Sequence, residues 1–287
     1  MKGIFRQLFR MVGLVLAAGL ASAVLVRYSP GALVDQRELN QRLSEESLAD
    51  MRAQKARNSN VGVNFLAYLR NLTHGDLGYS ESNNAPIASL IADRAPATLR
   101  ELGVGLGGGW LIGLGLAIPA GCFRRAWMYD AASSAAAGLL LSLPAALIAY
   151  LCLMAGTASG TVLVIVLAPR IFRFARNLLV QAYGAHHVEI ARARGIREWR
   201  ILSAHVLPET APQMLALLAS SVSMAIGAAI PVEAICDAPG LGRLAWQAAT
   251  ARDLPLLVNL TMLVTVATIA AVMLSEMAAS REASALL

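Results

Sequence analysis

Apolar runs of about 20 residues recur along this sequence, and each is long enough to cross a hydrocarbon core roughly 30 Å thick as a helix. Hydrophobic residues make up 57% of the 287 residues, whereas charged residues make up only 15%. A soluble domain carries about a quarter charged residues, so a soluble fold is disfavoured. A membrane β-barrel needs alternating strands of about 10 residues, and the sequence lacks that alternation. The chain is therefore predicted to be all-α, a polytopic bundle of transmembrane helices.

About six spans are expected. They lie near 9–27, 97–122, 131–154, from 161 to the arginines that begin at 170, 210–233 and 255–278. The second contains Gly105, Gly109 and Gly113 at four-residue intervals, a pattern that permits close helix packing.

The spans divide the chain into four regions. These are a first transmembrane helix at 1–27, an extracytoplasmic loop region at 28–96, a transmembrane core at 97–278 and a cytoplasmic tail at 279–287. A cleaved signal peptide is the alternative for the first helix, because a basic flank, an apolar core and Ala21-Ser22-Ala23 also fit that description.

The distribution of basic residues predicts the orientation. Segments 1–10, 123–130 and 170–206 carry 3, 2 and 7 Arg or Lys, whereas 155–160 and 236–256 carry 0 and 2. Short cytoplasmic loops are enriched in Lys and Arg, and long loops are exempt from the rule. Both termini are therefore expected in the cytoplasm, in a bacterial-type inner membrane.

A basic, amphipathic stretch interrupts the apolar segments at 188–208, with the sequence VEIARARGIREWRILSAHVLP. Gly195 follows Glu189 by six residues, and Leu207-Pro208 close the stretch twelve residues after Gly195. Glycine can adopt positive φ, so Gly195 can reverse the chain between two short helices. The stretch resembles the EAA loop of ABC importer permeases, the cytoplasmic helix-turn-helix on which the ATPase subunit seats.

Further segments resemble, in order, the dipeptide, oligopeptide and nickel permease family of ABC importers. Residues 27–31 (RYSPG) resemble its R-x-x-P-G exit from the first span, and 75–80 (GDLGYS) its G-D-L-G-x-S element. Residues 91–99 (IADRAPATL) resemble I-x-x-R-x-P-x-T-L, which begins the second span.

The connection between the fifth and sixth spans also resembles this family. Glu233, then 239–244 (PGLGRL) and 252–255 (RDLP), match it in order, and His205 stands where peptide permeases commonly place His. The resemblance covers most of 1–275. It departs from the family in the short link 155–160, in the tail after Glu276 and at Ile190, which replaces the first Ala of the EAA motif.

The resemblance implies a type I ABC importer permease, MetI-like in architecture, with its coupling loop at 181–208. The chain would form half of the pathway for a peptide, a nickel complex or another small solute. Its partners would be a second homologous permease, two ABC ATPase subunits and an extracytoplasmic substrate-binding protein. No cofactor is expected on this chain, since ATP and Mg²⁺ would bind the ATPase subunits.

The residues expected to couple to the ATPase follow from the EAA stretch. They are Glu189, Ala191, Arg194, Gly195, Arg197, His205, Leu207 and Pro208. Ala191 and Ala193 keep the surface small enough for close seating, and Glu189 and Glu198 offer carboxylates to a partner.

The arginines of this stretch have two interpretations. Arg194, Arg197 and Arg200 recur at three-residue spacing, which predicts one helix face. They either anchor the loop at the cytoplasmic side or contact the partner. Trp199 is likewise an interfacial anchor or part of the contact.

The residues of a substrate path are less clear. Candidates are Ser220, Ser223, Glu233, Asn259, Thr261 and Thr265. The serines share a face of the fifth span with Gly227, and the threonines share one of the sixth. Such residues more often let helices pack and form hydrogen bonds. Glu233, at the outer end of the fifth span, is a gate, a substrate group or merely interfacial.

No catalytic site or metal site is expected. The G-x-x-x-x-G-K-[S/T] phosphate loop is absent, and His186 and His187 lack other metal ligands nearby. The three cysteines are too few for a disulfide framework. The net charge of +6 sits beside apolar spans, which fits membrane orientation better than nucleic-acid binding.

Two other classes remain as alternatives. A secondary transporter is expected to show intramembrane acids or internal repeats, and neither is convincing here. A membrane scaffold derived from a permease is consistent with the short 155–160 link and the altered tail.

Overall fold

The structure, a computed structural model, describes residues 11, 13–22, 24–25, 70–71, 75–122 and 127–285, with backbone alone from 274 onward. A short apolar helix lies at Gly13–Ser22. The flanks of the span expected at 9–27, the RYSPG segment at 27–31 and most of the loop region 28–96 lie outside the described residues.

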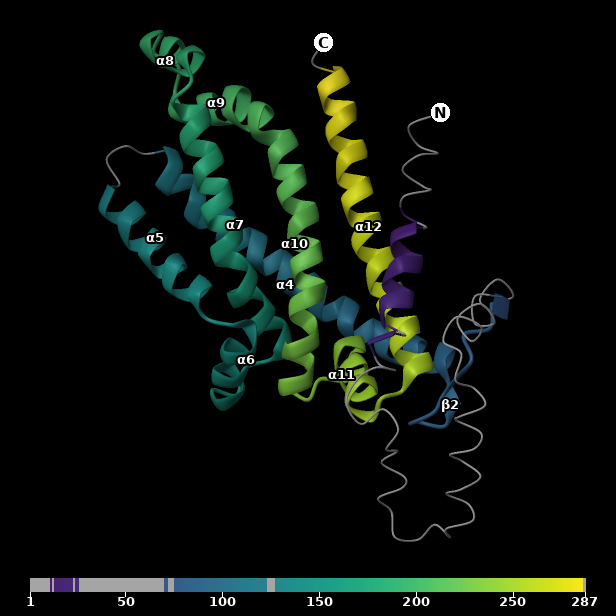
Figure 1. Ribbon diagram of the computed structural model, residues 1–287. Helices are drawn as coiled ribbons and strands as arrows, with labels where there is room; N and C mark the ends of the chain where they lie inside the picture. The colour runs from purple at the N-terminus through teal and green to yellow at the C-terminus, as the bar shows by residue number, and fades with distance from the viewer. Residues whose placement is uncertain are drawn as a thin grey trace, which may run out of the picture. The chain divides into compact units, whose positions relative to one another are not determined.

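The other described elements are nearly all helical (Figure 1), which confirms the all-α prediction. They are β1 (Tyr79–Ser80), β2 (Ala85–Pro86), α4 (Ile87–Cys122), α5 (Trp127–Ser142), α6 (Ala145–Met154), α7 (Ser159–Tyr183), α8 (His186–Ala193), α9 (Glu198–Ile201), the π-helix η1 (Leu202–Val206), α10 (Leu207–Ile235), α11 (Leu241–Ala251) and α12 (Leu254–Ala285).

Three described helical segments are long and apolar enough to cross a membrane: α4, Glu198–Ile235 and Leu254–Met273. The third expected span, at 131–154, is instead a pair of helices, α5 and α6, bent by 98°. Pro144 lies at the bend with φ −61° and is the N-cap of α6. Proline lacks an N–H and disfavours a helical conformation in the residue before it, so α5 ends and a new helix begins. If the pair is counted as one span, the number rises to four.

Two other helices extend beyond their expected limits. α4 begins at Ile87, ten residues before the expected boundary at 97. α7 continues through Arg170, Arg173 and Arg176 to Tyr183 without interruption.

The chain divides into two compact units. The first comprises 1–96 with 243–267, and the second comprises 97–242 with 268–287. α4, α11 and α12 each contribute residues to both units.

In the second unit, α7 packs closely against α4 along the glycine stripe. A Cβ built on Gly105 would lie 2.5 Å from the Cβ of Leu163, and one on Gly113 would lie 2.7 Å from Cγ2 of Ile171. Real side chains do not approach so closely, so α7 occupies the space that the glycines leave. The predicted close packing of the second span is confirmed.

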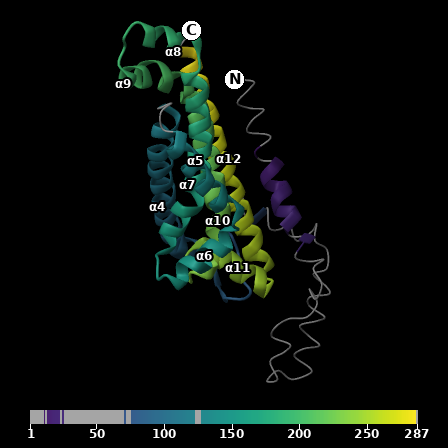
Figure 2. The ribbon, with the colours of Figure 1, turned by 90° about the vertical axis from the view of Figure 1, so that its left-hand side faces the viewer.

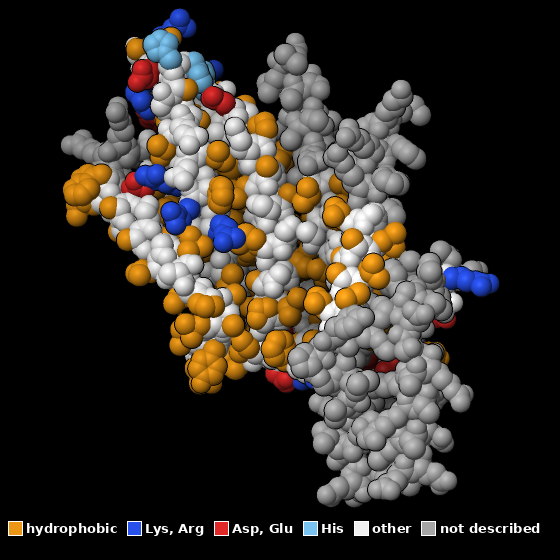
Figure 3. Space-filling view, viewed as in Figure 1, with side chains coloured by type: hydrophobic (Ala, Val, Ile, Leu, Met, Phe, Trp, Pro, Cys, Tyr) orange, Lys and Arg blue, Asp and Glu red, His pale blue; other side chains and the backbone are white. Residues whose placement is uncertain are grey.

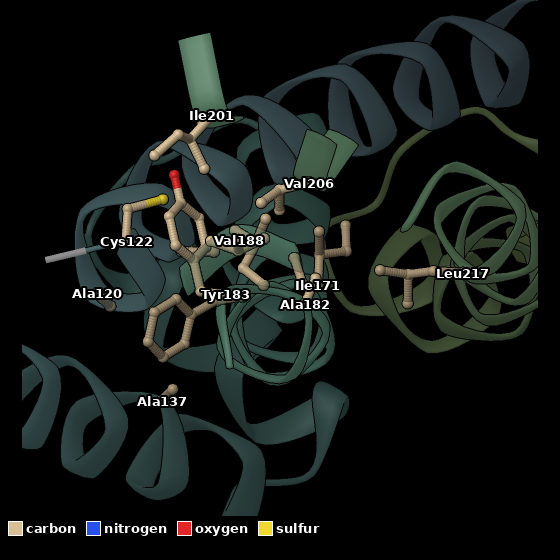
Figure 4. Packing of buried hydrophobic residues seen from close by; sticks show 14 of the residues in the cluster. Ala120, Cys122, Ala137, Ile171, Ala182, Tyr183, Val188, Ile201, Val206 and Leu217 are labelled. Carbon is tan, nitrogen blue, oxygen red and sulfur yellow. The ribbon is translucent and has the colours of Figure 1, made fainter. Parts of the chain in front are cut away.

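The core of the second unit continues into the segment that follows α7. Leu179 and Tyr183 of α7 pack in one cluster with Val188 of α8, Ile201 of α9 and Val206 of η1. Figure 4 shows Tyr183, Val188, Ile201 and Val206 of this cluster, with the Tyr183 hydroxyl facing the Cys122 sulfur. α8 and α9 lie beside each other beyond the end of α7 (Figure 2). Because Val188 and Ile201 belong to the same hydrophobic cluster as α7, that cluster holds α8 and α9 to the helical bundle.

In the first unit, a two-stranded hairpin precedes α4. Tyr79 pairs with Pro86 and Ser80 with Ala85 in antiparallel register. Gly78 has φ +76°, which glycine adopts without strain, and its carbonyl accepts a hydrogen bond from the N–H of Ile87 at the start of α4. The hairpin is thus fixed to the first turn of that helix.

Candidate functional site

The sequence-predicted coupling loop forms a helical hairpin, α8–α9, closed by Gly195. Gly195 has φ +75°. The N–H of Ile196 donates to the carbonyl of Ala191 at 3.2 Å, and the N–H of Gly195 donates to that of Arg192 at 3.0 Å. These two bonds form a Schellman motif, in which a left-handed residue ends a helix. The predicted reversal at Gly195 is confirmed.

The hairpin has a buried side and an exposed side. Val188 and Ile201 are fully buried, and Ala191 is 4% exposed. The prediction that Ala191 presents a small surface to a partner is therefore wrong, because its side chain packs in this chain's own core. Ala193, by contrast, is exposed.

Glu198 is also engaged within the hairpin. Its Oε1 and Oε2 accept hydrogen bonds from Arg192 Nε at 2.7 Å and Nη2 at 3.2 Å. The hydrogen bond to Glu198 raises the pKa of Arg192. This bidentate pair joins α8 to α9. The offer of the Glu198 carboxylate to a partner stays a prediction.

The three arginines do not share one helix face as predicted. Arg194 follows α8, whereas Arg197 is the N-cap of α9 and Arg200 lies within that helix. The turn at Gly195 separates the first from the other two. All three are exposed.

The outer surface of the hairpin combines charged and apolar side chains. Trp199 is 75% exposed and Ile190 is 43% exposed. We define the seating surface as the exposed hairpin residues Glu189, Ile190, Arg194, Gly195, Arg197, Trp199 and Arg200.

His205 contacts the hairpin's own first helix. It lies in η1, and its ring stacks on that of His187 at a centroid distance of 6.4 Å. Nε2 of His187 lies 3.2 Å from Oε2 of Glu209. Leu207 and Pro208 begin α10, and both are exposed.

Glu233 has a different environment from any that the sequence suggested. Its side chain is fully buried. Oε1 accepts a hydrogen bond from Thr98 Oγ1 at 2.7 Å, and Oε2 accepts one from the N–H of Gly242 at 2.6 Å. The N–H of Leu241 donates to Thr98 Oγ1 at 2.7 Å. A carboxylate at a helix N-terminus is stabilised by the free N–H groups and the helix dipole, so Glu233 caps the start of α11. Its side chain is not exposed to solvent in this structure.

The glycines of the PGLG segment make this cap possible. A Cβ on Gly240 would lie 2.1 Å from Glu233 Oε2, and one on Gly242 would lie 2.7 Å from the Cα of Ile230. Two segments that separately resemble the family, PATL and PGLG, therefore meet at a single buried carboxylate.

A second buried carboxylate joins two further segments in the first unit. Asp253 Oδ2 accepts hydrogen bonds from Ser80 Oγ at 2.5 Å, Ser82 Oγ at 2.8 Å and the N–H of Ser82 at 2.9 Å. Burial alone would raise the pKa of Asp253, but these bonds outweigh it and hold the pKa below its usual value. Asn259 Nδ2 donates to the carbonyl of Leu77 at 3.0 Å. The GDLGYS and RDLP segments are thus bound to each other.

The other candidate path residues mostly bond to their own helices. The hydroxyls of Ser220, Thr261 and Thr265 donate to the carbonyls of Leu217, Leu257 and Thr261, respectively. Ser223 is half-buried. Asn259, Thr261 and Thr265 belong to the first unit, and Ser220, Ser223 and Glu233 belong to the second. These hydrogen bonds agree with the packing interpretation.

Sequence reasoning did not single out the polar residues that α7 exposes. Arg170, Arg173 and Asn177 are exposed at spacings of three and four, which places them on one helix face. An open cavity of about 490 Å³ lies between α5 and α7. Figure 3 shows basic side chains on this face of the bundle. The available signal was three arginines at three-residue spacing within an apolar span.

Comparison with known proteins shows several relatives. Residues 111–280 match the family described as "Binding-protein-dependent transport system inner membrane component". A Brucella suis biovar 1 (strain 1330) protein, named as a peptide permease, is 27% identical over 297 residues, covering 93% of each chain. The nickel import system permease protein NikB of Staphylococcus aureus (strain bovine RF122 / ET3-1) is 25% identical over 276 residues, covering 89% of this chain and 83% of its own.

The fold also matches a solved structure. A chain of the MetNI methionine ABC transporter, in an inward-facing conformation, is 23% identical with a TM-score of 0.56. The match covers 70% of this chain and 97% of that chain. The predicted MetI-like architecture is confirmed.

Proposed function

Since the chain belongs to the family of inner membrane components of binding-protein-dependent transport systems, and is a permease subunit of an ABC importer, we propose that it forms half of the pathway for a peptide or a similar small solute. The whole-length similarity to a protein named as a peptide permease supports this substrate class. A nickel complex is the second candidate, because NikB is similar over most of its length as well.

The seating surface of the α8–α9 hairpin is proposed to receive the ATPase subunit. The hairpin buries one apolar side in the permease core and leaves its charged residues exposed, and this arrangement is the main support for the proposal. Such a surface can bind a partner without unfolding its own support. ATP and Mg²⁺ would act on the ATPase subunits.

The hairpin is also joined to the bundle by continuous helix. From Glu198 to Ile235 the chain is helical without a loop, through α9, η1 and α10. Tyr183 and Val206 pack in one cluster, so the end of α7 and the start of α10 are fixed to each other. A displacement of the hairpin would therefore pass directly into α10.

The proposed mechanism is alternating access. ATP would close the two ATPase subunits, each drawing its permease hairpin with it, and the helical bundles would rock to open the pathway outward. Rigid-body switching of this kind requires packed elements that move as units and a ligand that favours one arrangement. The packed hairpin and the unbroken α9–α10 helix meet the first requirement.

The proposed assembly places both termini in the cytoplasm, with a second homologous permease beside this one and a binding protein outside. The arginines beyond the end of α7, Arg192, Arg194, Arg197 and Arg200, contrast with the absence of Arg and Lys from 155–160 and support this orientation. The family's description supports a binding-protein partner. We favour a heterodimer of permeases.

Replacement of Gly195 tests the coupling proposal. Gly195→Val forces a β-branched residue into the left-handed region, at a cost of about 1–2 kcal/mol, and distorts the hairpin. No atom lies within 4 Å of a Cβ built on Gly195, so the disturbance is confined to the turn. In proteoliposomes containing the whole transporter, we expect ATP-driven uptake to fall about tenfold or more, while the ATPase subunits keep hydrolysing ATP.

Two matched variants control for nonspecific damage. Gly195→Asn should retain most uptake, because Asn tolerates the left-handed conformation. Gly184→Ala changes a glycine of ordinary φ, −81°, in the same region and should also retain uptake. Full uptake by Gly195→Val would contradict the coupling assignment.

A further inference from the structure

Arg170, the first residue of the polar face of α7, lies near the middle of that helix. Arg170 is the eleventh residue after Ser159 and the thirteenth before Tyr183, or about 16 and 20 Å from the helix ends at 1.5 Å per residue. Its Nη1 lies 2.8 Å from the Met224 sulfur. Met224 is eleven residues from the end of α10 at Ile235 and seventeen from its start. Both helices therefore place Arg170 about halfway across a core roughly 30 Å thick.

An arginine at that depth does not face lipid tails without a large cost. Insertion of a charged side chain at the bilayer centre costs about 3 kcal/mol or more, and such residues usually line water-filled paths or pair with acids. Arg170 and Arg173 are exposed, and within the described residues neither forms an ion pair. The α7 face is therefore expected to border water.

The neighbouring face of α10 is small and polar. Ser220 and Gly227 lie four residues before and three after Met224, so they share its helix face, and both are exposed. The contact between Arg170 and Met224 places this face beside the arginines. Ser220 and Gly227 therefore lie on the face of α10 that contacts Arg170.

The cavity between α5 and α7 offers more positive than negative charge. Its wall includes Asp130, Ser134, Arg173 and Arg176. Arg176 and Asp130 form an ion pair, with Arg176 Nε 2.8 Å from Asp130 Oδ1, so they offset each other. Arg173 adds a charge without a partner among the described residues. One additional anionic group would balance it.

We propose that Arg170 and Arg173 form an anion-binding stretch of the translocation pathway, which takes a carboxylate of the passing solute. This inference rests on the proposed function, because it assumes that the chain transports a solute inward. A phospholipid phosphate has related chemistry, but headgroups lie at the interface, whereas Arg170 lies near mid-depth. The site therefore belongs to the solute.

Charge-selective labelling tests this site without knowledge of the natural solute. Ser134→Cys places a thiol in the cavity wall of the assembled transporter, in phosphatidylcholine nanodiscs. The probes are an anionic sulfonatoethyl and a cationic trimethylammonioethyl methanethiosulfonate. Both react with the same thiolate, so the ratio of their rates reports the local electric field. The unmodified chain, with its three native cysteines, gives the background rates.

We expect both reagents to reach Ser134→Cys and the anionic one to be favoured. Adding Arg173→Gln should lower the anionic-to-cationic rate ratio about tenfold, the size expected for removing a unit charge a few ångströms away in a watery site. Arg173→Lys should preserve the ratio. Arg100→Gln, an exposed arginine of α4 outside the cavity, is the matched control and should leave the ratio unchanged.

Three results would overturn the proposal. The thiol could be unreactive to both aqueous reagents, or the ratio could be independent of Arg173. The preference could also vanish when phosphatidylglycerol is added to the nanodiscs, which would assign the site to a lipid headgroup. ATP-driven uptake is measured in parallel on the unmodified transporter. If the transporter takes up solute but Arg173→Gln does not change the labelling-rate ratio, this inference alone is contradicted. If the transporter takes up no solute, the proposed function is contradicted, and the labelling result still reports whether the cavity favours anions.

Discussion

The two ends of the second unit use charge in opposite ways. At the α8–α9 hairpin, apolar side chains hold the helices to the core, and Glu189, Arg194 and Arg197 remain exposed. At the other end, Glu233 is fully buried and caps α11 together with Thr98. Charges kept in water are available to a partner, whereas a buried carboxylate must be bonded within its own chain. The hairpin is thus suited to binding, and the Glu233 cap to maintaining structure.

The strongest test of this contrast is Gly240→Ala. The added Cβ would lie 2.1 Å from Glu233 Oε2, so the carboxylate must leave its place and its hydrogen bond to the N–H of Gly242. We expect a loss of about 3 kcal/mol in unfolding free energy, because a bond to a buried charged group is broken and its partners stay unsatisfied. Thermal unfolding of the purified protein in detergent would measure it.

Gly227→Ala is the matched control. Gly227 lies on the same helix as Glu233 and has no atom within 4 Å of a built Cβ. Alanine in a helix interior is more favourable than glycine by roughly 0.5–1 kcal/mol, so this variant should be unchanged or slightly stabilised. Equal melting temperatures for the two variants would refute the structural role of the cap.

A buried carboxylate in the first unit should give a smaller effect that depends on pH. Asp253→Asn weakens the bonds to Ser80 and Ser82, and we expect a loss of about 2 kcal/mol at neutral pH. The folded pKa of Asp253 is lowered, so its stabilisation is present above the unfolded value of about 3.9 and is lost as pH falls through the folded pKa.

Melting temperatures from pH 7 to pH 3 would test this. The gap between the unmodified protein and Asp253→Asn should persist down to about pH 4 and narrow below it. Asp93→Asn, at an exposed aspartate of α4, should show little change at any pH. A gap that widened in acid would contradict the assignment.

The smallest effect is expected at the Arg192–Glu198 pair of the hairpin. The two side chains are 38% and 41% exposed, so solvent screens their attraction. Glu198→Gln should cost about 0.5 kcal/mol, less at high salt. A double-mutant cycle with Arg192→Gln would isolate the pair. A coupling of several kcal/mol would mean that the hairpin, like the Glu233 cap, depends on an internal charge.

Local patterns predicted the local geometry well. The turn at Gly195 and the packing along Gly105, Gly109 and Gly113 follow from what a glycine permits at one position, and the structure has both. The break at Pro144 was legible in the same way, but the apolar run around it was interpreted as one span.

Tertiary contacts could not be read from the sequence. Ala191 and Ala193 look alike in the motif, yet only the first is buried, because burial depends on which face of α8 meets α7. Asp253 and Ser80 are 173 residues apart, so no local pattern links them. The roles of Glu233 and Arg170 likewise depend on which helices lie beside them.

Cross-linking at the hairpin tests the central claim, that the seating surface receives the ATPase subunit. In the assembled transporter, Arg197→Cys should form a cross-link to the ATPase with a short thiol-directed reagent. Thr157→Cys, an exposed position in the α6–α7 link at the other end of α7, should not. A cross-link from Thr157→Cys to the ATPase, with none from Arg197→Cys, would contradict the account.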